Sequence, residues 1–249
     1  PLYTATTSGA AVYVDGVAVA GGAGMMGTAS GRIAALAKVR DDIAVTYQSQ
    51  LDEMARGLIA AFAESDQSAI PTLPNAPGLF TWGGGPAMPT AGVINVGLAA
   101  SIRVNAAIDP DQGGSPAVLR DGGAAGSAYV YNSTGATGYP DRLHQLLDAL
   151  DQPRSFDPAA GAGANLNLSS YASSSVSWLQ AARKSASDDA DYKNTLLNRA
   201  SDALSKATGV NIDEEMTLLL DLERSYQASS KLISTIDNMF GALLAAAGR

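Results

Sequence analysis

The C-terminal residues 208–249 carry a heptad repeat, and this pattern constrains the fold more than any other feature of the chain. With Ile212 at position a, eight of the ten a and d positions up to Leu243 are apolar. A repeat of 3.5 residues kept over nearly five heptads predicts a helix that packs along a seam against a partner helix. We call these eight residues the terminal seam: Ile212, Leu219, Leu222, Tyr226, Ile233, Ile236, Phe240 and Leu243.

Polar residues mark the predicted start of this helix. Asn211 is a suitable N-cap, and Glu214 three residues later completes an Asn variant of the capping box. Asp213, Glu214 and Glu215 complement the positive end of the helix dipole. Gly209 suits the C′ position of a preceding helix. The alternative is an amphipathic helix lying on its own domain, but a length of roughly 50 Å favours a partner helix.

The N-terminal part of the chain predicts a β-hairpin followed by a long helix. Asp15-Gly16 lies between two triplets of β-prone residues, which is the signal for a two-residue hairpin turn. A glycine-rich connector follows at residues 21–27. From Ser30, a suitable N-cap residue, apolar residues recur every three or four positions, and the prolines at 71, 74 and 77 follow the end of the element. The residues on this helical face are Ile33, Leu36, Arg40, Ile43, Tyr47, Leu51, Met54, Leu58 and Phe62.

Residues 67–140 are rich in Gly, Pro, Ser and Asn, and they predict turns with short strands at 93–96 and 101–105. A short helix is predicted at 141–150, and a second long helix at roughly 165–207 with a polar middle at 184–193. The better apolar positions of that second helix are Leu166, Val176, Leu179, Leu196, Leu197, Ala200 and Leu204.

These elements predict a mainly α fold with a smaller β part, built from long antiparallel or coiled-coil helices. Residues 1–28 would form the end of a β-rich insert with its hairpin. Residues 29–207 would form an elongated helical domain with the Gly/Pro-rich, β-containing middle at 67–140. Residues 208–249 would form the terminal coiled-coil helix.

Composition excludes several classes of function. The net charge is −8 and the basic residues are scattered, which argues against nucleic acid as a partner. No run of about 18 apolar residues is present, so no membrane insertion is expected. The chain has no cysteine, which suits either a cytosolic protein or an exported one that avoids disulfides. It begins at Pro1 with no signal peptide, and we expect it to be a fragment of a longer protein.

No catalytic, cofactor or metal site is predicted. Gly113-Gly114-Ser115-Pro116-Ala117 resembles the nucleophile elbow of a serine hydrolase, with His144 as a candidate base. However, Pro116 has no N–H to stabilise an oxyanion. Asp109-Pro110-Asp111 only faintly suggests a calcium loop, because the later Glu is missing.

Three stretches near the C-terminus resemble the signature of bacterial flagellar axial proteins. They are Gly209–Glu215, Ser225–Ser229 with its Tyr-Gln-Ala sequence, and Ile233–Met239. The first leans toward the family of hook-associated protein 1. Upstream, Ser30–Leu36 with Gln50–Ala55 resembles that family's helix after its β-rich insert, and Ile102–Asn105 resembles a β segment. Leu220–Arg224 departs from the glutamine-rich run that usually precedes the Tyr-Gln-Ala sequence.

This resemblance implies a secreted structural subunit of the bacterial flagellum at the hook–filament junction. Its partners would be other axial subunits (the hook protein and the next hook-associated protein), copies of itself, and a cytoplasmic export chaperone on the terminal helix. It would leave the cell through the flagellar export apparatus and act outside the cell. The alternatives are a hook or rod subunit, a soluble coiled-coil adaptor, or a hydrolase that depends on Ser115.

Overall fold

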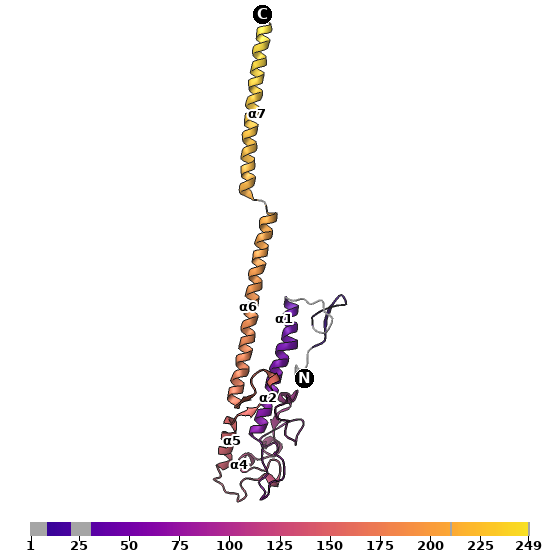
Figure 1. Ribbon diagram of the computed structural model, residues 1–249, viewed down its shortest axis with the longest axis vertical. Coiled ribbons are helices and arrows are strands. Elements are labelled where there is room, and N and C mark those ends of the chain that lie inside the picture. Colours follow the sequence, from indigo (N-terminus) through magenta and orange to yellow (C-terminus); the bar gives the residue numbers. More distant parts are fainter. Residues whose placement is uncertain (1–8, 21–30, 210, 249) are drawn as a thin grey trace. The chain divides into compact units, whose positions relative to one another are not determined.

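The computed structural model describes residues 9–20, 31–209 and 211–248, and it confirms a mainly α chain with a smaller β part. The chain divides into two compact units, Pro1–Lys184 and Ser185–Arg249. Helix α6 (Leu168–Thr208) begins in the first unit and ends in the second, and α7 (Ile212–Ala247) belongs to the second (Figure 1). The two long helices predicted from the C-terminal half are therefore present.

The predicted hairpin is confirmed as β1 (Val12–Val14) paired antiparallel with β2 (Val17–Ala20). Asp15 and Gly16 form the turn with φ of 50° and 79°. Positive φ at both turn residues matches the right-handed twist of the flanking strands, which explains the Asp-Gly pair. The connector predicted at 21–27 lies outside the described residues.

The long helix predicted from Ser30 is a helical run in three parts. It consists of α1 (Arg32–Lys38), the π-helical turn η1 (Val39–Ile43) and α2 (Ala44–Ala61). Its N-cap is Gly31, and Ser30 lies outside the described residues. The apolar spacing did not predict the π turn. There Asp41 pairs with Arg40 (Nε to Oδ1, 2.6 Å) and accepts the backbone N–H of Gly9 at 2.8 Å.

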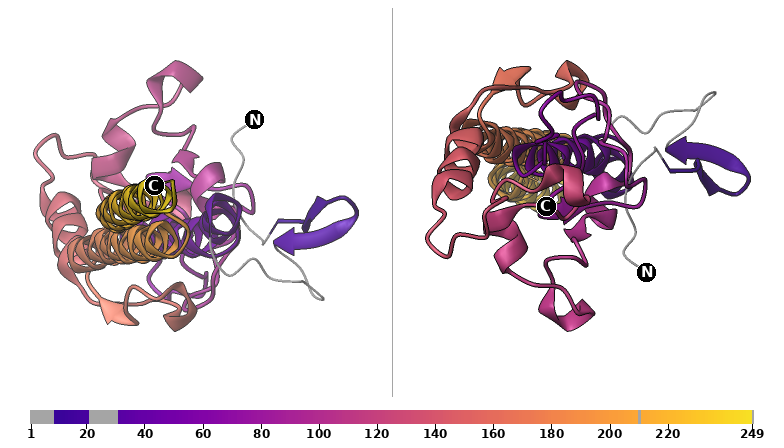
Figure 2. Two further views of the ribbon diagram at one scale, coloured as in Figure 1. Left: turned by 90° about the horizontal axis from the view of Figure 1, so that it is seen from above. Right: turned by 90° about the horizontal axis from the view of Figure 1, so that it is seen from below.

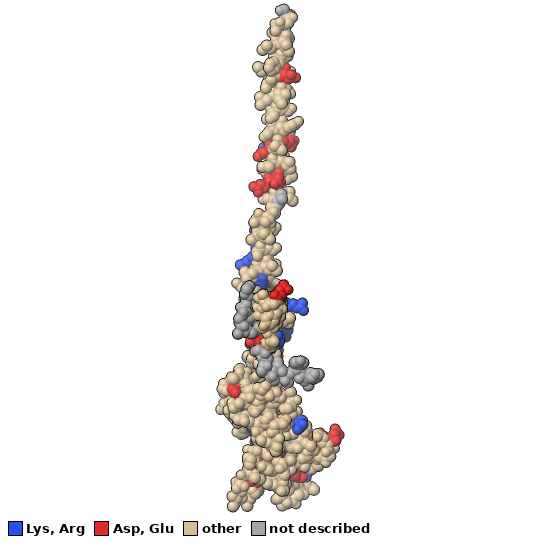
Figure 3. Space-filling model, turned by 90° about the vertical axis from the view of Figure 1, so that its right-hand side faces the viewer, with Lys and Arg blue, Asp and Glu red and all other residues tan. Residues whose placement is uncertain are grey.

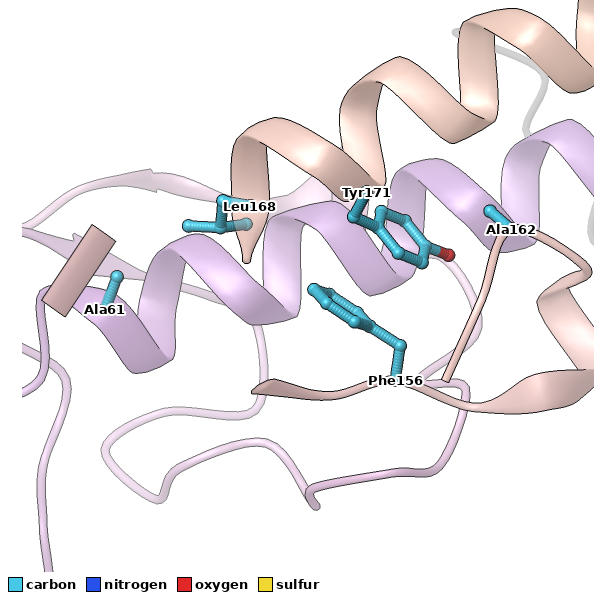
Figure 4. Packing of buried hydrophobic residues seen from close by; sticks show 5 residues of the cluster. All are labelled: Ala61, Phe156, Ala162, Leu168 and Tyr171. Carbon is cyan, nitrogen blue, oxygen red and sulfur yellow. The ribbon is translucent and has the colours of Figure 1, made fainter. Parts of the chain in front are cut away.

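Helix α2 is the centre of the first unit. Shorter elements between residues 62 and 167 gather around it (Figure 2). Ala55 and Ile59 pack against Leu98 in one hydrophobic cluster. In the other, the Phe156 and Tyr171 rings stack with centroids 3.9 Å apart (Figure 4). That cluster comprises Ala61, Phe156, Ala162, Leu168 and Tyr171.

In the described residues the strands form three two-stranded antiparallel sheets: the hairpin and two sheets among these shorter elements. The short helix predicted at 141–150 is confirmed as α5 (Asp141–Asp151). The other elements are β3 (Phe80–Thr81), α3 (Leu98–Ser101), β4 (Arg103–Val104), η2 (Pro110–Gln112), α4 (Ala117–Asp121), η3 (Ser127–Tyr129), β5 (Arg154–Ser155), η4 (Pro158–Ala160) and β6 (Asn165–Leu166).

The two predicted middle strands have different outcomes. The prediction of a strand at 93–96 is wrong, because this segment forms turns between Gly92 and Gly97, whose φ values are 67° and 79°. Positive φ on both sides breaks the extended conformation that a strand needs. Of the strand predicted at 101–105, only Arg103–Val104 is formed, paired with β3.

Buried carboxylates attach the loops to α2 and to the residues after it. Asp52 accepts the N–H groups of Gly97 and Ala99, each at 2.8 Å. Glu64 accepts the N–H groups of residues 124–125 at 3.1 and 2.9 Å. Buried backbone N–H groups need acceptors, and these loops have few ladder partners. The side chains of Asp52 and Glu64 therefore replace the sheet hydrogen bonds that the loops lack.

A buried ion pair makes the strongest of these attachments. Arg56 and Glu53 pair at 2.8 Å, with side chains 3% and 0% exposed. Glu53 also accepts the N–H of Asp157 at 2.8 Å, and Arg56 donates to the carbonyl of Ser155. The pair therefore fixes residues 155–157, which carry Phe156 into the hydrophobic cluster.

The hydroxyl of Tyr171 is buried and has no hydrogen-bond partner among the described residues. Burial, reinforced by the charge of Glu53, raises the pKa of this phenol well above its usual range. Tyr171→Phe should therefore be neutral or stabilise the first unit by about 1 kcal/mol, since it removes an unsatisfied polar atom and keeps the ring. Calorimetry should show a melting temperature raised by roughly 2–4 °C. A lower melting temperature would show that the hydroxyl has a partner.

Two aspartates make the stability of the first unit depend on pH. The Asp66 carboxylate accepts hydrogen bonds from the hydroxyl and N–H of Ser68 and the N–H groups of residues 72–73, and they lower its pKa strongly. The Arg120 side chain, followed by Asn132, lowers the pKa of Asp121 to about 2. Both groups are therefore held in the ionised form in the folded state.

Asp121→Asn should make the chain less stable at pH 6, and this difference should shrink as the pH falls from about 4 to 2. The pKa of Asp121 is lower in the folded state than in the unfolded state. Between these pH values the unfolded state therefore binds more protons, and the wild type loses the stability that the ionised Asp121 contributes. Urea unfolding at several pH values measures the difference. Asp148→Asn, at an exposed position of α5, is the matched control for the substitution.

Candidate assembly surface

Helix α7 has the polar start that the sequence predicted. Asn211 is the N-cap, and its side-chain oxygen accepts the N–H of Asp213 at 3.2 Å. A capping box would use the N–H of Glu214, so the side chain caps one residue earlier than expected. Gly209 donates its N–H to the carbonyl of Ser205 at 2.7 Å and closes α6. The two helices therefore have separate ends and are joined by residues 209–211.

The terminal seam is uncovered along the whole of α7. All eight of its residues are exposed, from 48% for Ile236 to 77% for Tyr226. The structure places them on one helix, as predicted, and brings no other described residue over them. A contiguous apolar surface of this length is far larger than soluble monomers usually expose, and such surfaces mark interaction sites.

The sequence analysis missed further apolar residues that widen this surface. At about 100° per residue, the apolar side chains between Met216 and Leu222 span about 200° of the helix circumference. A seam for one partner helix spans roughly 100°. This part of α7 can therefore be covered fully only by more than one neighbour. Exposed apolar residues of α7 outside the seam are Met216, Leu218, Leu220, Leu232, Met239 and Leu244.

The remaining groups of α7 oppose burial only weakly. Four hydroxyls donate to the carbonyl four residues earlier in the helix, so they need no other partner. Between Ser225 and Gly248 the charged residues are Lys231 and Asp237. Figure 3 shows correspondingly few charges on this face of α7. The hydroxyls belong to Thr217, Ser225, Ser234 and Thr235.

Ser115 and His144 lack the arrangement of a serine hydrolase. Ser115 precedes α4, and its hydroxyl accepts the N–H of Ala117 at 3.4 Å. Pro116 is the N-cap of α4, so the residue after the serine offers no N–H to an oxyanion. His144 is exposed on α5. Nothing in this geometry supports a nucleophile and base acting together.

The aspartate at the start of the faint calcium-loop pattern caps a short helix. Asp109 accepts the N–H of Asp111 at 3.0 Å and the side-chain amide of Gln112 at 2.7 Å, so it caps η2. No cluster of three or more His, Cys, Asp or Glu side chains able to hold a metal occurs in residues 9–20, 31–209 and 211–248. Across the same ranges, no helix combines the length and apolarity needed to span a membrane.

A terminal helix with an uncovered heptad surface is typical of structural subunits that assemble by helix packing. Residues 203–246 match the family model described as flagellar basal body rod FlgEFG protein C-terminal. The matched segment contains the whole terminal seam. The match supports a structural subunit of the bacterial flagellum, in the class of axial proteins. A search of curated proteins and a search of solved structures found no match.

Proposed function

We propose that the chain is a structural subunit of the hook–filament junction, related to hook-associated protein 1, and that it assembles through the terminal seam. The observation that carries this proposal is that the residues matching a flagellar rod and hook family are those that leave an apolar helix uncovered. The resemblance of Gly209–Glu215 favours the junction. A hook or rod subunit is the alternative, because the matched family includes such proteins.

The proposed partners follow from the surface of α7. Its neighbours would be other axial subunits, such as the hook protein and the next hook-associated protein, and copies of the chain itself. The circumference of the apolar surface near Leu219 supports several neighbours rather than one. The same surface would need cover before assembly, which supports a chaperone bound to α7 until export through the flagellar apparatus to the cell exterior.

Burial of the terminal seam would be the main driving force for assembly. At roughly 25 cal/mol per Å² of apolar area, the seam could contribute on the order of 10 kcal/mol before the cost of ordering. Assembly needs no reaction step, which fits the lack of a hydrolase geometry at Ser115.

Binding to purified flagellar parts tests the proposal. The chain should co-sediment with hooks, and gold labelling in electron microscopy should place it at the end of the hook where the filament starts. Labelling along the hook, or on rods alone, would identify the alternative subunit and contradict a junction role. Failure to bind hooks, rods and filaments would contradict the proposal as a whole.

A further inference from the structure

A second apolar stripe lies on the part of α6 that belongs to the second unit. Its large residues are exposed, as those of α7 are. At about 100° per residue these positions fall within an arc of roughly 140°, wide enough for a helix to pack against it. The family resemblance and the terminal seam leave this stripe unexplained. Its residues are Tyr192, Leu196, Leu197, Ala200, Ala203 and Leu204.

The connection between α6 and α7 has the length of a helical hairpin. Thr208 ends α6 and Ile212 begins α7, so three residues join them. Antiparallel helices are commonly joined by two to five residues. Gly209 is the first of these residues. Its φ is not positive in the structure, but glycine can adopt at little cost the left-handed conformation that reverses the chain after a helix. The chain can therefore fold α7 back along α6.

One antiparallel register aligns the two apolar stripes. Placing Ala207 opposite Ile212 brings a and d positions of both helices into the same layers, as antiparallel packing requires. Two layers pair a charged residue with an apolar one, and there the aliphatic parts of the Glu215 and Lys193 side chains would cover the apolar residue. The remaining layers are apolar. In order from the connection, the layers are Ala207 with Ile212, Leu204 with Glu215, Ala200 with Leu219, Leu197 with Leu222, and Lys193 with Tyr226.

We propose that, in the unassembled subunit, α7 folds back on the end of α6 as an antiparallel hairpin that covers the first half of the terminal seam. The hairpin covers Ile212 to Tyr226 and leaves Ile233 to Leu243 open to a partner. Assembly then requires the hairpin to open, because the same side chains cannot face α6 and a neighbouring subunit together. This role in assembly rests on the proposed function, but the hairpin itself does not.

Disulfide cross-linking tests the hairpin directly, since the chain has no cysteine of its own. Ala200→Cys with Leu219→Cys places two thiols in one layer of the hairpin. The matched control is Ala200→Cys with Ile236→Cys, whose second thiol lies beyond the paired segment. In oxidised glutathione, the first pair should form an intrachain disulfide roughly tenfold faster than the control, at a rate independent of protein concentration.

Equal rates for the two cysteine pairs would overturn the hairpin. Disulfides that only join two chains would also overturn it and would show that a second copy covers the stripe. An intrachain disulfide in a chain that binds no flagellar part would support the hairpin and contradict only the proposed function.

Discussion

Ile233→Asp combined with Ile236→Asp is expected to abolish hook–filament joining and motility while residues 1–205 remain folded. Both side chains are exposed on α7, so the folded chain loses no internal packing. In the assembly the two carboxylates would be buried without partners, at a cost of about 3–5 kcal/mol each, in addition to the lost isoleucine burial. Swimming assays and co-sedimentation with hooks measure the effect.

A matched control separates the effect of charge within the terminal seam from the effect of added aspartates on helix formation. Ser234→Asp with Asn238→Asp adds the same charge to the same turns of α7, at heptad positions b and f. This variant should keep motility, and circular dichroism should give equal helix content for both double variants. Motility that survives the isoleucine substitutions, or that is lost equally in the control, would show that the terminal seam is not the assembly surface.

Arg56→Met should destabilise the first unit by about 3–5 kcal/mol, the largest effect expected from one substitution in this chain. It removes one partner of the buried ion pair and leaves the Glu53 carboxylate in the interior without its counter-charge. Residues 155–157 also lose the hydrogen bond from Arg56 to the carbonyl of Ser155. Urea unfolding followed by tryptophan fluorescence measures this unit, since Trp82 and Trp178 both lie in it.

Two further variants show whether the lost pairing causes the effect. Arg56→Met with Glu53→Leu should recover part of the stability, because no unpaired charge remains, although the N–H of Asp157 loses its acceptor. Arg183→Met, at an exposed position of α6, should change stability by no more than about 0.5 kcal/mol. An Arg56→Met variant within 1 kcal/mol of the wild type would contradict a structural role for the pair.

Local patterns in the sequence predicted the regular elements and the eight residues of the terminal seam. The Asp15-Gly16 turn, the cap at Asn211 and the heptads of α7 depend on residues at most a few positions apart. Backbone conformation and helix periodicity therefore suffice to predict them. The wider apolar surface around Leu219 could also have been predicted from the sequence, since helix geometry alone places Met216 and Leu220 beside Leu219.

The tertiary structure alone decided how the first unit is held together. Asp52, Glu53 and Glu64 bond to groups between 45 and 104 residues away, and no local spacing indicates such partners. The same is true of segment 93–96, where β-prone residues form turns because Asp52 and Asp157 bind backbone N–H groups in and beside it. The sequence by itself determined which helix carries the apolar surface. Only the folded structure shows that these side chains are exposed in the described residues, because their cover depends on contacts between elements distant in the chain.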